Sequence, residues 1–320
     1  MTKYLLTRSA AALPVLLLAS IGIFSLVRLI PGDPAVTLAG PDATPEMREA
    51  IRAQLGLDQP FLSQYLTWLR DVASLDFGRS FRLGGDVGEI VRDGAANTVL
   101  LTGSALLLAV LGAAVTAMLA VGLDRAWLDH LLAGLNTLAL AVPGFAVGTL
   151  LVIAFAVKLQ LLPAGGLPPA GLLAQPDITV QYLALPAVSM ALPAWAVLTR
   201  YLTEALRTQM NAPYVTTARA AGVPRRQLVL RHALRNALPP SVTVLGIQVG
   251  ALLGGSLLIE NIFAWPGLGR VLGEAINTRD YPVVQVLLLL SVAVFVLAQL
   301  LTDVVQAMLD PRVRLSGGTR

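Results

Sequence analysis

The chain has 320 residues, of which 56% are hydrophobic and only 13% charged, and its mean hydropathy is +0.72. This composition indicates a polytopic membrane protein and excludes a soluble enzyme. The net charge is +4, but we expect no nucleic-acid partner, because the basic excess can be assigned to one side of a membrane. The chain contains no cysteine, which excludes a disulfide framework and a thiolate metal site.

The first apolar run, residues 10–30, follows two basic residues and predicts a retained first span. A cleaved signal peptide is the competing interpretation, but its apolar core would hold only about 7–15 residues and a clear cleavage site would follow. Residues 31–97 are the only long hydrophilic stretch, and we expect them to form an external helical region. Within it, Thr44-Pro45 is typical of a helix start and Gly56 of that helix's end, and residues 61–75 predict a second, amphipathic helix.

Five further apolar runs predict the remaining spans, so residues 1–320 are expected to form a single all-α domain of six transmembrane helices. The runs cover residues 98–123, 131–157, 183–198, 237–259 and 282–302. The run at 183–198 is short, but it can continue as helix through residue 206. Bends or helix starts are expected at the prolines of these runs: 143, 186, 193, 239 and 240.

The distribution of charge predicts the orientation of these spans. An even number of spans places both termini on one side of the membrane, and the segments on that side carry a net charge of +8. The segments on the opposite side carry −5. The positive-inside rule therefore predicts that both termini and the loop at residues 199–236 are cytoplasmic.

That cytoplasmic loop has the pattern of a short helix, a glycine stop and a second helix. Residues 218–221 favour helix, Gly222 can adopt the left-handed conformation that ends a helix, and Pro224 suits the first turn of the next. The loop contains seven arginines against one acid, Glu204. The arginines can serve topology alone or belong to a docking element, and the ordered helix–glycine–helix pattern favours docking.

The same stretch resembles the coupling loop of binding-protein-dependent ABC transporter permeases, whose pattern is Glu-Ala-Ala, three residues, Gly, nine residues and Ile-x-Leu-Pro. Ala218, Gly222 and Leu234 match that pattern. Four positions depart from it: Thr216, Thr217, His232 and Arg235. The match is closer to the peptide/nickel branch, where Thr-Ala-Arg-Ala-x-Gly and His-x-Leu-Arg-Asn-Ala are usual. The resemblance implies that a set of loop residues couples the chain to an ATPase: Tyr214, Thr216, Thr217, Ala218, Arg219, Gly222, Arg225 and Arg226.

The fifth span has small residues on one helix face, at Gly246, Gly250 and Gly254. Such a face lets another helix approach closely, either within the chain or in a second subunit. Spacing alone slightly favours packing within the chain. Gln248 is a polar group at membrane depth on another face of this span. Such groups usually face the protein interior or a cavity, and we assign Gln248 to the pathway or the outer gate.

Residues 260–270, Glu-Asn-Ile-Phe-Ala-Trp-Pro-Gly-Leu-Gly-Arg, resemble the peptide/nickel permeases almost residue for residue. Further strings that resemble them stand in the expected order along the chain, at residues 31–34 (Pro-Gly-Asp-Pro), 55–60, 279–285 and 310–314. In these permeases the stretch that residues 260–270 resemble helps to form the outer gate. The resemblance therefore implies a gate role for Glu260 and Trp265, although Trp265 can instead be an interfacial anchor.

Motifs that are absent constrain the energy source. The sequence has no phosphate-binding G-x-x-x-x-G-K-[ST] loop and no H-E-x-x-H motif, so we expect no cofactor, no metal site and no catalytic residue on this chain. None of the second to sixth predicted spans contains Asp, Glu, Lys or Arg, which ion-coupled carriers commonly need at membrane depth. Energy must then come from another subunit.

The resemblance implies a type I ABC importer permease fold in the lipid bilayer of a bacterial inner membrane. It also implies three kinds of partner: a second, homologous permease, two cytoplasmic ATPase subunits that bind ATP and Mg²⁺, and an extracytoplasmic solute-binding protein. The alternatives are a self-powered carrier or channel and an intramembrane enzyme, and no nucleophile–base or metal constellation supports the enzyme.

The expected cargo is a peptide or peptide-like solute, with glutathione or chelated nickel as the alternative. A bare nickel ion would seek imidazole or thiolate ligands, and the predicted spans contain neither. The connection around Leu161-Leu162-Pro163 resembles glutathione and nickel members more than dipeptide members. Peptides remain the first expectation, because they are the broadest cargo class of the family.

Overall fold

The computed structural model describes residues 2–29, 35–36, 43–54, 56–169, 171 and 175–309. Within these ranges the chain is helical and forms no β-strand, which confirms the predicted all-α class. The helices are α1 (Thr2–Leu29), α3 (Pro45–Gln54), α4 (Phe61–Ala73), α5 (Val87–Leu123), α6 (Ala126–Ala141), α7 (Gly144–Leu151), α8 (Pro176–Met210), α9 (Pro213–Ala220), α10 (Arg225–Gln227), α11 (Leu234–Ile262), α12 (Leu268–Thr278) and α13 (Tyr281–Leu309), with two π-helical segments, η1 (Val152–Lys158) and η2 (Leu228–Ala233).

Five helices are long and apolar enough to cross a membrane, and a sixth span is formed if a bent pair of helices is taken as one. The five are α1, α5, α8, the continuous stretch from α10 to α11, and α13. They contain all the predicted spans except residues 131–157. Each is longer than its apolar run, because polar residues continue the helix past the hydrophobic segment.

The helix α5 begins before the apolar run from which its span was predicted. Asp86 caps this helix, since its Oδ1 accepts the N–H of Gly88 at 2.7 Å. Residues 87–97, the last part of the expected external region, therefore continue directly into the spanning helix as its first turns. A side-chain cap before the apolar run is sufficient to start the helix early.

The end of α8 agrees with the expected continuation of the short fourth span. This helix continues without interruption from Pro176 to Met210, so the first part of residues 199–236 is helical. Arg200 and Glu204 therefore lie on the same helix as the predicted span, beyond its apolar run at residues 183–198.

The predicted third span, residues 131–157, is broken rather than straight. α6 ends at Ala141, and the pair formed by α6 and the stretch Gly144–Lys158 is bent by 99°. Val142 and Pro143 have extended backbone conformations between the two helices. Proline lacks the N–H that would continue the helix, which explains the break at the position where a bend was predicted.

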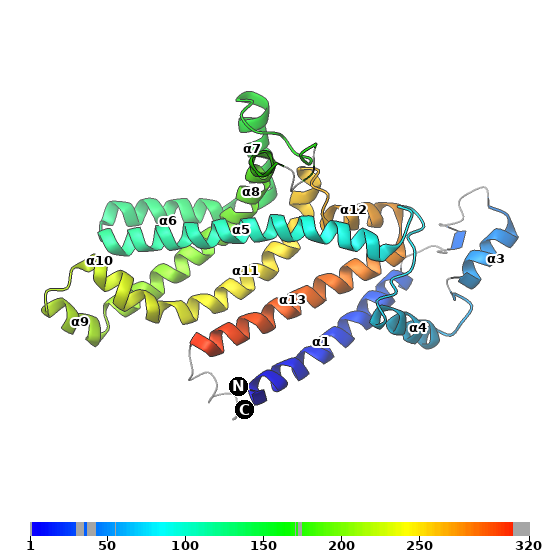
Figure 1. The fold of residues 1–320 in the computed structure, drawn as a ribbon, viewed down its shortest axis with the longest axis horizontal. Coiled ribbons are helices and arrows are strands. Elements are labelled where there is room, and N and C mark those ends of the chain that lie inside the picture. The colour runs from blue at the N-terminus through cyan, green and yellow to red at the C-terminus, as the bar shows by residue number, and fades with distance from the viewer. Residues whose placement is uncertain are drawn as a thin grey trace.

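The core of the bundle is the contact between α5 and α8 (Figure 1). One face of α5 carries small buried side chains that recur every fourth residue, Ala105, Ala109, Ala113 and Ala117. This narrow face lets α8 approach closely, and Trp195 of α8 fills the space beside Gly112. The two helices therefore form a rigid centre around which the other spans are arranged.

The two ends of the bundle carry different elements (Figure 1). The beginning of α1, the end of α13, α9 and α10 lie at one end, and α3, α4 and α12 lie at the other. An ion pair of 3.4 Å between Arg8 and Asp303 joins the first and last helices near that shared end. This arrangement places the start of α1 and the end of α13 on one side, as an even number of spans requires.

The external region is attached to the first span through α4. Tyr65 of α4 is buried, and its hydroxyl is hydrogen-bonded to the Ser20 hydroxyl at 2.8 Å. The ring of Phe24 packs edge-on against Tyr65 with a centroid distance of 5.6 Å. The predicted cap of the preceding helix is confirmed, because Thr44 Oγ1 accepts the N–H of Met47 at 3.3 Å. The Pro-Gly-Asp-Pro string at residues 31–34 and the string at residues 310–314 lie outside the described residues.

Candidate functional site

The helix–glycine–helix pattern of the loop that follows α8 is confirmed. α9 ends at Ala220, and Gly222 follows with φ of 83°, in the left-handed region. The N–H of Gly222 donates to the Arg219 carbonyl at 3.0 Å, and the N–H of Val223 donates to the Ala218 carbonyl at 3.2 Å. These two bonds close the helix and turn the chain into α10.

Apolar packing fixes α9 to the end of the bundle. Val215 is fully buried and belongs to a cluster that includes Leu206 of α8, Leu228 and Val229 of η2, and Ala117 of α5. A helix held by a buried side chain moves together with the elements it touches. A displacement of α9 would therefore be transmitted to α5 and α8.

Arg225 points towards the chain. Its Nε donates to the Val121 carbonyl at 2.9 Å, and its Nη2 lies 3.0 Å from Asp124 Oδ1. This guanidinium therefore ties the start of α10 to the turn between α5 and α6. Arg225 therefore stabilises the loop through contacts within the chain, and this role is separate from any contact with a partner subunit.

Five of the loop residues expected to couple to an ATPase have exposed side chains: Tyr214, Thr216, Thr217, Arg219 and Arg226. Ala218 is half-buried against the apolar cluster. Tyr214 is 39% exposed, and its hydroxyl donates to Gln209 Oε1 at 2.8 Å and accepts from Asn236 Nδ2 at 3.0 Å. The loop thus presents a polar and basic surface on a rigid base.

The glycine face of α11 packs within the chain at two of its three positions. A Cβ on Gly246 would overlap the side chain of Thr302, and one on Gly250 would overlap Phe295, both on α13. A Cβ on Gly254 would meet nothing within 4 Å. The first two glycines therefore serve the contact between α11 and α13, while Gly254 leaves its surroundings open.

Glu260 is fully buried, and its carboxylate joins three helices: its own helix α11, α5 and α12. Its carboxylate accepts hydrogen bonds from Thr98 Oγ1 at 2.7 Å, from the N–H of Gly269 at 2.7 Å and from the N–H of Arg270 at 3.1 Å. The last two donors are at the N-terminus of α12, where backbone N–H groups lack partners within the helix. A Cβ at Gly267 would overlap this carboxylate, which explains a glycine at that position.

Trp265 is also fully buried, so it is not an anchor at the membrane interface. Its Nε1 donates to the Asn97 carbonyl at 3.0 Å, and Asn97 Nδ2 donates to the Pro266 carbonyl at 2.8 Å. Together with Glu260, these bonds lock the segment between α11 and α12 onto α5. Within this chain the residues predicted for an outer gate form a fixed frame.

Gln248 lines a cavity of about 170 Å³ between α7, α8 and α11. Ser189 and Pro193 of α8 and Phe145 of α7 line the same cavity. The side chain of Gln248 is half-buried. A polar amide of an apolar helix therefore lies beside a cavity, as such groups usually do, and its role in the pathway stays a prediction.

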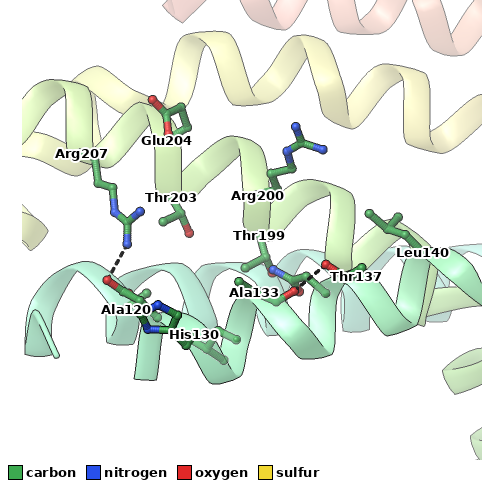
Figure 2. A pocket seen from close by; sticks show the side chains of 13 residues that line it. Ala120, His130, Ala133, Thr137, Leu140, Thr199, Arg200, Thr203, Glu204 and Arg207 are labelled. Atoms are coloured by element: carbon green, nitrogen blue, oxygen red, sulfur yellow. Dashed lines mark hydrogen bonds and ion pairs between the residues drawn. The ribbon is translucent and has the colours of Figure 1, made fainter. Parts of the chain in front are cut away.

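A larger cavity, of about 450 Å³, lies between α5, α6 and α8 towards the end that carries α9. Figure 2 shows Arg207 reaching from α8 to α6, where its Nη2 lies 2.8 Å from Asp129 Oδ2. In the same view Arg200 and Glu204 leave α8 on the side away from α6. The charges of this cavity were counted as loop residues in the sequence, because the apolar run ends at Leu198.

Comparison with known proteins decides the family. Residues 109–315 match the model of the family described as "Binding-protein-dependent transport system inner membrane component", and residues 1–102 match its companion, "Binding-prot-dependent transport system membrane comp, N-term". The chain belongs to this family.

Relatives of known name agree over the full length. The "Glutathione transport system permease protein GsiC" of Escherichia coli (strain K12) is 35% identical over 314 residues, which cover 98% of this chain and 99% of the relative. The protein of the same name from Salmonella typhimurium (strain LT2) is 37% identical over 315 residues, with the same coverage. The chain is thus an inner-membrane, multi-pass permease subunit of a peptide/nickel-type ABC importer.

Proposed function

We propose that the chain forms half of the translocation pathway of an ATP-driven importer for peptides or peptide-like solutes. The similarity to glutathione permeases over 98% of the chain carries the choice of cargo class. Glutathione is itself a tripeptide. The cargo in the names of the relatives therefore belongs to the peptide-like class that the sequence led us to expect. A second, homologous permease would pack against the exposed side of α8 and complete the pathway.

The cytoplasmic loop supports the mode of energy coupling. ATP and Mg²⁺ would bind to two separate ATPase subunits, one of which docks on the exposed residues of α9. Because Val215 ties α9 to α5 and α8, closure of the ATPases would move this helix as a lever and shift the bundle as a rigid body. In this proposal both termini and α9 lie in the cytoplasm.

The opposite end would receive cargo from a solute-binding protein. α3, α4 and α12 lie at that end (Figure 1), and α12 is held by the Glu260 carboxylate. Because α12 is held in place, the binding protein would dock on a rigid surface at this end. The frame formed by Glu260 and Trp265 would contribute to the outer gate by holding the end of α11, with the moving contacts made between the two permeases.

The test is uptake into proteoliposomes that contain the full complex, with the binding protein outside and ATP inside. We expect accumulation of labelled glutathione or of a labelled dipeptide. Transport of free nickel without a chelator, together with no transport of glutathione, dipeptides or oligopeptides, would contradict the proposed cargo class. Uptake of a nickel chelate alone would assign the chain to the metal-chelate members of the branch.

A further inference from the structure

An apolar groove lies between the last turns of α5 and the stretch formed by α10 and η2. Its volume is about 450 Å³. On α5 the lining residues run from Val115 to Leu123, and on the other side they run from Arg226 to Leu230. They recur at intervals of three and four along each stretch, so one helix face lines each side of the groove.

The α5 side of the groove belongs to the hydrophobic part of a span. Val115 and Leu123 are 53% and 52% exposed, and both lie in the uncharged run that begins at residue 98. α5 is one of the helices that are apolar enough to cross a membrane. The rise from Val115 to Leu123 is about 12 Å, close to the roughly 15 Å of hydrocarbon in one leaflet of a bilayer. These exposed side chains therefore require an apolar neighbour over the depth of a leaflet.

The groove ends at charged residues. Asp124 follows Leu123 directly, and Arg226 carries the charge among the residues that line the groove. The Arg226 side chain is exposed and, within the described part of the chain, makes no hydrogen bond or ion pair. Asp124 is already paired, because Arg225 Nη2 lies 3.0 Å from its Oδ1. An arginine near the end of a span lays its aliphatic stem on apolar surface and extends its guanidinium to the lipid headgroups.

We propose that this groove binds an anionic phospholipid, with an acyl chain along α5 and the phosphate at Arg226. The planar guanidinium can donate two parallel hydrogen bonds to a phosphate group. An apolar span of the second permease would cover Val115 and Leu123 but would leave Arg226 without a counter-charge. An ATPase subunit could pair with Arg226, but it is water-soluble and would not cover Val115 within the hydrocarbon. A phospholipid matches both parts of the groove.

The surrounding charge favours an anionic headgroup over a zwitterionic one. Arg125 follows the end of α5, Arg231 follows Leu230, and both side chains are exposed. Basic residues clustered at the end of a span attract anionic lipids to that leaflet. The phosphate of a zwitterionic lipid carries its own cationic group, which these arginines repel.

The groove also adjoins the base of the coupling loop. Val229 and Met118 line the groove, and both belong to the apolar cluster that holds Val215 of α9. A lipid in the groove would therefore cover the outer side of the contact between η2 and α5. The inference concerns the membrane surface of the chain and is independent of the transported cargo.

Photo-labelling of the full complex tests the site. The complex is reconstituted into phosphatidylcholine nanodiscs that contain a trace of phosphatidylglycerol with a photoreactive acyl chain. A parallel sample contains the same trace of phosphatidylcholine with the same photoreactive chain. After irradiation, labelled peptides of this subunit are quantified by mass spectrometry. We expect the glycerol lipid to label residues 115–123 about fivefold more than the choline lipid, the selectivity that one arginine contributes near an anionic lipid.

Two variants assign the label to the groove. Arg226→Gln should reduce labelling by the glycerol lipid to the level of the choline lipid, while Arg235→Gln, which removes an exposed arginine outside the groove, should leave it unchanged. Gly122→Phe should prevent labelling without a change in charge, because a Cβ at Gly122 meets nothing within 4 Å and the ring can occupy the groove.

Three results would overturn the proposal. Equal labelling of residues 115–123 by the two lipids in the wild-type complex would mean that the groove holds bulk lipid without selection. Labelling by the glycerol lipid that persists in Arg226→Gln would remove the assigned headgroup contact. Absence of any label from residues 115–123, with labels elsewhere on the subunit, would mean that another subunit covers the groove.

Discussion

Thr98 on α5 and Glu260 on α11 are joined by a hydrogen bond of 2.7 Å, although 162 residues separate them in the chain. The same Thr98 hydroxyl accepts the N–H of Leu268 at 2.8 Å, and the Glu260 carboxylate accepts two further N–H groups of α12. One hydroxyl and one carboxylate therefore hold three helices together at the end opposite α9. The residues that the sequence suggested as a gate are tied to the fixed part of the bundle.

The first prediction concerns the stability of this junction. Glu260→Ala leaves the buried N–H of Gly269 and the partly buried N–H of Arg270 without this acceptor, and the loss at a buried group costs about 1–3 kcal/mol. We expect a clear decrease in the unfolding temperature of the purified protein, measured by intrinsic fluorescence in detergent. Glu274→Ala, on the exposed face of α12, is the matched control and should unfold as wild type does. Equal unfolding temperatures for both variants would contradict the junction.

The second prediction separates the glycines of α11. Gly250→Leu should force α11 away from Phe295 and lower thermal stability, because even a Cβ at that position overlaps the ring. Gly254→Leu should leave the stability of the isolated subunit unchanged, since its surroundings within the chain are open. If Gly254 faces the second permease, the same variant should reduce co-purification of that subunit. A stability loss at Gly254 equal to that at Gly250 would show that the face packs differently.

The third prediction tests α9 as the coupling element. Gly222→Val should abolish transport and uncouple ATP hydrolysis from cargo while the protein still inserts, because φ of 83° strains a β-branched residue. Gly222→Asn is the control, since asparagine tolerates the left-handed region, and it should retain a substantial part of the activity. Thr217→Trp should also block transport, by filling the exposed docking surface of α9. Normal transport by Gly222→Val and Thr217→Trp would mean that another element couples the subunits.

The fold could be predicted where apolar runs, caps and glycine stops act locally. The spans, the cap at Thr44 and the stop at Gly222 all follow from short-range rules, and the structure confirms them. The number of residues in each helix could not be predicted in the same way. α8 continues to Met210 although its apolar run ends at Leu198, because neighbours such as Thr116 on α5 support its polar turns.

Only part of the candidate site could be predicted, because short-range rules identify continuous segments and do not identify contacts between distant ones. The coupling loop is a continuous segment, so its residues could be identified from one stretch of sequence. The partners of Glu260 and Trp265 lie on α5, far away in the chain, and no local pattern reveals a contact of this kind. Arg200 and Glu204 were assigned to the loop because the apolar run ends at Leu198, although α8 itself continues past them to Met210.

The fourth prediction concerns orientation. Ser63 on α4 and Gln227 on α10 lie at opposite ends of the bundle (Figure 1), and no native cysteine interferes with labelling. In intact cells an impermeant maleimide should label Ser63→Cys and should not label Gln227→Cys. The reverse pattern would invert the topology derived from the charge distribution. Permeabilised cells, in which both cysteines should react, provide the control for accessibility.

The most direct test of the account is the energy source of transport. The full complex is reconstituted into liposomes with ATP enclosed and with the binding protein and labelled glutathione outside. We predict accumulation that requires hydrolysable enclosed ATP and persists after a protonophore and a sodium ionophore have dissipated the ion gradients. Accumulation driven by a proton or sodium gradient in the absence of ATP would contradict the account and assign the chain to the self-powered carriers.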